Sequence, residues 1–88
     1  MNSNQVAKIV SEDFSELKSN HKKIRYWRHK INTDVVLFFP RRKVVDSICL
    51  TRIPVGFHIN TGIVHAVKFK CYTESELMQI IIQIHEEK

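Results

Sequence analysis

Cationic and aromatic side chains are interleaved between residues 21 and 30, and this mixture suits nucleic acid. Lysine and arginine neutralise phosphates and release counterions, while tyrosine or tryptophan stacks on an unpaired base for about 1–3 kcal/mol. The segment therefore predicts contacts with a single strand or with a phosphate backbone. The residues assigned to these contacts are Lys22, Lys23, Arg25, Trp27, Arg28, His29 and Lys30.

Two further groups of residues extend this candidate surface. The first is a run of three cations after Pro40, between two predicted strands. We expect it to form an exposed loop tip that clamps phosphates or pairs with an acidic protein surface. The second alternates with apolar residues ahead of the last predicted helix, as on the outward face of a strand. The groups are Arg41, Arg42 and Lys43, and Lys68, Lys70 and Tyr72.

Charge is distributed unevenly along the chain. Residues 18–52 hold ten Lys or Arg against two Asp, a local charge of +8, whereas the remaining residues hold four Lys against seven acids. The net charge of +5 therefore conceals a basic middle and acidic ends. Such asymmetry predicts a polyanionic or acidic partner, because summed charge steers association without specifying a fold.

Catalytic and metal-binding patterns are weak by comparison. Arg25, Tyr26 and His29 are an alternative acid/base set of the kind that a ribonuclease-type toxin uses, but no phosphate loop or nucleophile motif accompanies them. The five histidines and two cysteines lack the short spacings of zinc ligands. We therefore expect a non-enzymatic protein without a metal or other cofactor.

Length and composition predict one globular domain over residues 1–88, with 43% hydrophobic and 26% charged residues. The first residues lack the pattern of a secretory signal, and the longest apolar run, residues 35–40, is far below the ~20 residues that cross a bilayer. We expect a cytoplasmic protein with no membrane partner. Cys49 and Cys71 are then expected to be free thiols.

Apolar residues at offsets of three and four predict two helices, over about residues 4–18 and 74–86. Ser3 or Asn4 is expected to cap the first helix and Asn20 to end it, while Thr73 and Glu76 form a capping box for the second. The apolar stripes are Val6, Ile9, Val10, Phe14 and Leu17, and Leu77, Ile80, Ile81 and Ile84. The second stripe is wide enough that part of it is either core or a homodimer interface.

Strands are predicted within residues 23–72, in the segments 23–29, 33–40, 44–52, 55–60 and 63–72, giving four strands or five. The apolar run at residues 35–39 indicates a strand covered on both faces. A turn at Thr61 and Gly62 joins the last two segments, and the apolar pattern favours a bulge at Gly62 over a two-residue loop. Alternation places Arg25, Trp27 and His29 on one face, where we expect them to join the Lys68, Lys70 and Tyr72 group.

The predicted fold is a small α+β domain with the order α-β-β-β(-β)-α, an antiparallel sheet and both helices on one face. The other face is expected to be open. This order resembles that of double-stranded RNA-binding domains, but Thr73, Glu74, Ser75 and Glu76 stand where that family has a Lys-rich signature, so we assign no family.

Together these patterns predict a small, basic nucleic-acid-binding module, for DNA or RNA. The alternative is a protein-interaction factor, a regulator or inhibitor, that docks its basic patch on an acidic surface of a partner.

Overall fold

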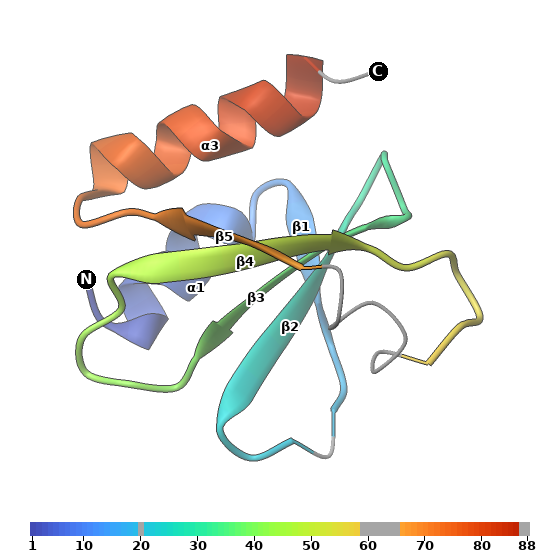
Figure 1. Cartoon of the computed structure of the whole chain (residues 1–88), viewed down its shortest axis with the longest axis horizontal. Helices are drawn as coiled ribbons and strands as arrows, with labels where there is room; N and C mark the ends of the chain where they lie inside the picture. Colours follow the sequence, from blue (N-terminus) through green and yellow to red (C-terminus); the bar gives the residue numbers. More distant parts are fainter. Residues whose placement is uncertain (20, 59–65, 87–88) are drawn as a thin grey trace.

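Five strands form one antiparallel sheet in the order β1-β2-β3-β4-β5, with one described helix before it and one after it (Figure 1). The computed structural model describes residues 1–19, 21–58 and 66–86. The predicted small α+β domain is confirmed. Its elements are α1 Ser3–Val10, β1 Phe14–Leu17, β2 Ile24–His29, β3 Val35–Pro40, β4 Ser47–Arg52, β5 Val67–Lys70 and α3 Glu74–Glu86.

Both helices pack on the same face of the sheet, as predicted. Val6 and Val10 of α1 share one apolar cluster with Leu77 and Ile81 of α3. The sheet side chains of this cluster include Trp27, Leu37, Phe39 and Ile48. At the start of α3 the predicted Thr73–Glu76 cap is present, since Thr73 Oγ1 accepts from the Glu76 N–H at 3.2 Å. The Glu76 carboxylate accepts from the N–H of Tyr72 rather than of Thr73.

The first helix is shorter than predicted. It ends at Val10, and Phe14 and Leu17 belong to strand β1, which pairs with β2. Its cap is Asn2, whose Oδ1 accepts from the Gln5 N–H, so the expectation of Ser3 or Asn4 was wrong. The turn after Val10 contains neither Gly nor Pro, and the helical spacing of apolar residues continues through it into the strand. Asn20 lies outside the described residues.

The face opposite the helices is covered at its centre, so the expectation of an open face was wrong. Tyr26, Val36 and Ile53 form a second apolar cluster there, and Val36 is fully buried. Val35, Leu37 and Phe39 are buried on the helix side, which confirms that this apolar run is covered on both faces.

The predicted strand over residues 55–60 is absent from its described part, because residues 55–58 form a turn and irregular backbone. Strand β5 pairs instead with β4, with Ile48 opposite Phe69 and Cys49 opposite Lys68. The predicted turn at Thr61 and Gly62 lies outside the described residues. Cys49 and Cys71 are free thiols, as expected. Over the described ranges, no helix combines the length and apolarity needed to cross a membrane.

Candidate nucleic-acid interface

Two connections of the sheet bring six cations together at one end. In an antiparallel pair the start of β2 lies beside the end of β3, so Ile24 is opposite Pro40 and the Arg41 N–H donates to the Lys23 carbonyl at 2.8 Å. The connection before β2 and the one after β3 therefore adjoin (Figure 1). We call this group the cationic end; it comprises Lys18, Lys22, Lys23, Arg41, Arg42 and Lys43, all of them exposed.

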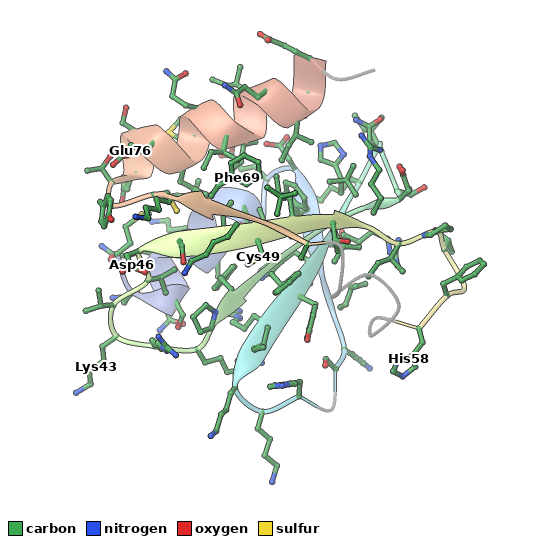
Figure 2. The ribbon with its side chains drawn as sticks, in the orientation of Figure 1. Lys43, Asp46, Cys49, His58, Phe69 and Glu76 are labelled. Carbon is green, nitrogen blue, oxygen red and sulfur yellow. The ribbon has the colours of Figure 1, made fainter. Side chains whose placement is uncertain are left out.

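Arg41 stands at the centre of the cationic end. It lines one shallow hollow with Leu17 and Lys18, and a second hollow with Arg42, Lys43 and the first residues of α1. Figure 2 shows the Lys43 side chain directed away from the ribbon. Among the side chains of residues 1–19, 21–58 and 66–86, none forms an ion pair or hydrogen bond with the charged side-chain group of Lys18, Lys22, Lys23, Arg42 or Lys43.

An acid beside the cationic end is already neutralised by another residue. Glu16 accepts two hydrogen bonds from the Arg25 guanidinium, at 2.7 and 2.8 Å. This bidentate pair lowers the pKa of Glu16, with smaller electrostatic contributions from Arg25 and Arg41, against the opposing effect of burial. Because Glu16 is held by Arg25, its carboxylate is not a competing partner for the free cations.

Cations at the opposite end of the sheet have structural partners instead. Arg28 donates to the carbonyls of Thr33 and Ile53, and Lys30 donates to the carbonyls of Ser11 and Glu12 after α1. These contacts hold loops and the end of a helix. Arg28 and Lys30 lie at the end of β2 that is opposite to Lys23, so they are apart from the cationic end.

Trp27 and His29, two of the side chains predicted to contact nucleic acid, are buried on the helix side of the sheet. Trp27 is 5% exposed, stacks on Phe39 at 6.4 Å between ring centroids, and has Arg25 over its ring at 5.3 Å. His29 is 1% exposed. The expectation that Arg25, Trp27 and His29 join Lys68 and Lys70 on an open face was therefore wrong, because those lysines lie on the face opposite the helices.

The hydrogen bonds of His29 specify the tautomer of its neutral ring. Its Nδ1 accepts from the backbone N–H groups of Ile31 and Asn32 at 3.1 and 2.9 Å, so the neutral ring carries its proton on Nε2. Burial lowers the pKa of His29, the electrostatic effect of His85, at 5.0 Å between ring centroids, lowers it further, and Asp13 opposes both. His85 in turn lies 3.1 Å from the Asp13 carboxylate.

The same register separates the alternative acid/base set. Tyr26 lies on the opposite face from Arg25 and His29 and is 1% exposed. Burial raises the pKa of Tyr26. A proton relay among these three residues would have to cross the sheet, so the geometry offers them no common substrate.

Lys70 and Tyr72 lie at the same end of the sheet as the cationic end, but on the side of the sheet formed by β5. Lys70 is opposite Ser47, the first residue of β4, and the Cys71 N–H donates to the Asp46 carbonyl at 2.9 Å. Tyr72 follows directly and is 58% exposed. It is therefore the aromatic side chain of the predicted set that remains accessible at this end of the sheet, whereas Lys68 lies farther along β5.

Lys18 is the member of the cationic end that the sequence interpretation left out. Strand β1 would have indicated Lys18, because once residues 14–17 are recognised as a strand, residue 18 falls in the connection to β2. The meeting of Lys23 and Arg41 was also accessible, since it follows from a hairpin between residues 23–29 and 33–40.

Comparisons with known proteins give this surface no precedent: no protein-family model, curated protein or solved structure matches the chain.

Proposed function

We propose that the chain is a small non-enzymatic module that binds nucleic acid through its phosphates, with the cationic end as the contact surface. The observation that carries this proposal is the convergence of six exposed cations from two connections, five of them without a side-chain partner in the described part of the chain. Phosphate contacts fix position without reading sequence, so we expect little base preference. The cytoplasmic location expected from composition belongs to the same proposal.

The division of labour among the cations supports this choice. The side chains of Arg25, Arg28 and Lys30 donate to a carboxylate or to carbonyls, whereas five cations of the cationic end have no side-chain acceptor within the part of the chain that the structure describes. Trp27 is buried, which leaves Tyr72 as the candidate for stacking on a base. Binding should therefore be dominated by the electrostatic contribution.

The test is a salt titration of nuclease-treated protein with fluorescent single- and double-stranded DNA and RNA of the same length. If each of the six cations neutralises one phosphate, log K should fall against log salt with a slope of roughly −4 for a single strand and −5 for a duplex. Absence of saturable binding to all four probes at low salt would overturn the proposal. A slope near zero would show that the contacts are not with phosphates.

A further inference from the structure

An edge strand lies beside an apolar pocket at the side of the molecule away from β1. Strand β5 is the last strand of the sheet, and within the described residues its strand neighbour is β4 alone. An edge strand presents backbone N–H and C=O groups that can pair with an added strand. β5 therefore supplies the backbone half of a peptide-docking site.

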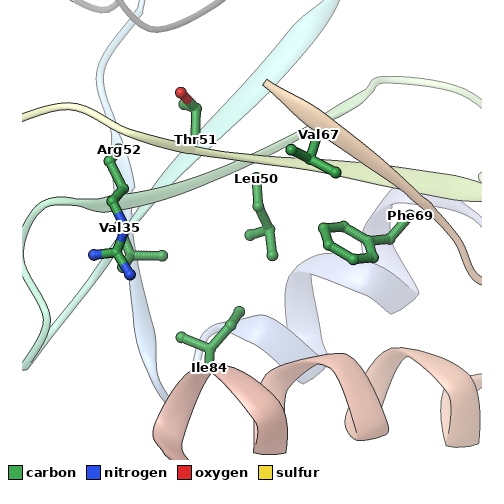
Figure 3. A pocket seen from close by; sticks show the side chains of 7 residues that line it. All are labelled: Val35, Leu50, Thr51, Arg52, Val67, Phe69 and Ile84. Carbon is green, nitrogen blue, oxygen red and sulfur yellow. The ribbon is translucent and has the colours of Figure 1, made fainter. Parts of the chain in front are cut away.

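The pocket lies on the helix side of the sheet, where it is lined by residues of β3, β4 and β5 and by Ile84 of α3, and it has a volume of about 390 Å³. Its size falls in the range of ordinary ligand sites. Figure 3 shows Leu50, Phe69 and Ile84 converging on it from β4, β5 and α3. Val67 stands at its edge and is 57% exposed, an unusual exposure for a valine on a strand. The pocket supplies an apolar contact for a side chain that lies next to β5.

The side-chain alternation of β5 specifies which peptide would fit. Val67 and Phe69 lie on the helix side of the sheet, and Lys68 and Lys70 lie on the other. Residues of an added strand would alternate in the same way, since cross-strand neighbours share a face. Apolar residues of the peptide would then lie against Val67, while the residues between them would face the two lysines. Acidic residues are the ones that suit the positions facing the two lysines.

A second copy of this chain is a poorer occupant. Antiparallel pairing of two β5 edges sets lysines of one copy near lysines of the other, and like charges on facing strands are destabilising. Each copy also carries a net charge of +5. Lysine on an edge strand is a common protection against such self-pairing. Charge complementarity therefore favours an acidic partner.

We propose that the groove between β5 and α3 binds an extended segment of a partner protein in which apolar and acidic residues alternate. The segment adds a sixth strand to the sheet at β5 and places an apolar side chain in the pocket. None of the six residues of the cationic end belongs to this groove, and Lys70, which lies at the same end of the sheet as they do, is left unchanged in the test, so either proposal can fail without the other.

The test uses a fluorescent, end-capped heptapeptide that alternates glutamate with valine and carries phenylalanine at its centre. We expect saturable binding, with amide shifts in the NMR spectrum of the intact chain concentrated at residues 67–70. Lys68→Glu should weaken binding by about tenfold, because it reverses one facing charge. Val67→Glu should do the same by placing a charge at the pocket. Both sites are exposed, and urea unfolding verifies that the variants remain folded.

Three controls decide the outcome. The matched charge reversal Lys23→Glu at the cationic end should change peptide affinity by less than about threefold. If it weakens binding as much as Lys68→Glu, the peptide binds as a general polyanion and the proposal is wrong. Equal binding of a peptide with proline at two consecutive central positions would exclude strand addition, because one of the two always replaces an N–H that pairs with the edge. Shifts at residues 67–70 that depend on protein concentration alone would identify a second copy as the occupant.

Discussion

The two ends of the sheet carry similar basic sequence but use it differently. At one end the side chains of Lys22, Lys23 and Arg42 have no acceptor among the described residues, while at the other Arg28 and Lys30 donate to backbone carbonyls. The local charge of the chain does not distinguish these roles. The hydrogen-bond acceptors near each cation distinguish them. A cation that donates to buried or terminal carbonyls stabilises the fold, whereas a cation without an acceptor is available to a ligand.

The same substitution made at both ends should separate the two roles. Arg28→Gln removes a charged donor from the carbonyls of Thr33 and Ile53, so we expect it to lower the free energy of unfolding by about 2–3 kcal/mol. Arg42→Gln should change stability by less than about 0.5 kcal/mol, since its side chain is exposed. Urea denaturation at neutral pH measures both. Equal losses of stability at the two positions would contradict the claim that Arg28 stabilises the fold and Arg42 does not.

The end of the sheet that carries Arg28 and Lys30 should also be the acid-sensitive one. The pKa of His29 is lowered in the folded chain below its ordinary value of 6.5, so the unfolded chain binds the proton more readily. Stability is therefore complete above that value and is lost as the pH falls through it toward the folded pKa, by at most about 1.4 kcal/mol per pH unit.

Chemical denaturation between pH 5 and 8 tests this pH dependence. His29→Gln should flatten the curve in this range, because it removes the imidazole whose pKa is lowered in the folded chain. A wild-type curve with no decline below the ordinary histidine value would contradict the neutral, doubly accepting state of the His29 Nδ1.

Tryptophan fluorescence should show the smallest effect. Trp27 is the sole tryptophan of the chain and is buried against Phe39, so saturating single-stranded DNA should leave its emission unchanged. The double variant Trp27→Phe with Tyr72→Trp moves the reporter to an exposed position at the same end of the sheet as the cations, where stacking on a bound base should quench it. Quenching in the wild-type chain would show that Trp27 reaches a base.

Regular elements were predictable where local signals agreed with packing. For α3, the cap of Thr73 and Glu76 precedes Leu77 and Ile81 at helical spacing, and the structure has the helix over the predicted residues. Strand β3 was equally clear from its unbroken apolar run. The end of α1 was not, because Lys30 binds the carbonyls of Ser11 and Glu12 from a distant strand and no Gly or Pro marks the turn.

Individual residues of the candidate site were predictable from the sequence, but the surface that they form together was not. Arg41 and Lys23 were both recognised, but their adjacency depends on the pairing of β2 with β3. The burial of Trp27 and His29 depends on which sheet face the helices cover, and alternation alone leaves the two faces equivalent. Long-range packing therefore decided which members of one basic segment remained accessible.

The most direct test of the account compares two charge-matched variants. Arg41→Glu with Arg42→Glu changes the cationic end, and Lys8→Glu with Gln79→Glu and Gln83→Glu lowers net charge equally at exposed positions on the two helices. In low salt, we expect the first variant to weaken binding to single-stranded DNA by roughly 100-fold or more and the second by less than about threefold. Equal losses in the two variants would show that net charge, not the cationic end, governs binding.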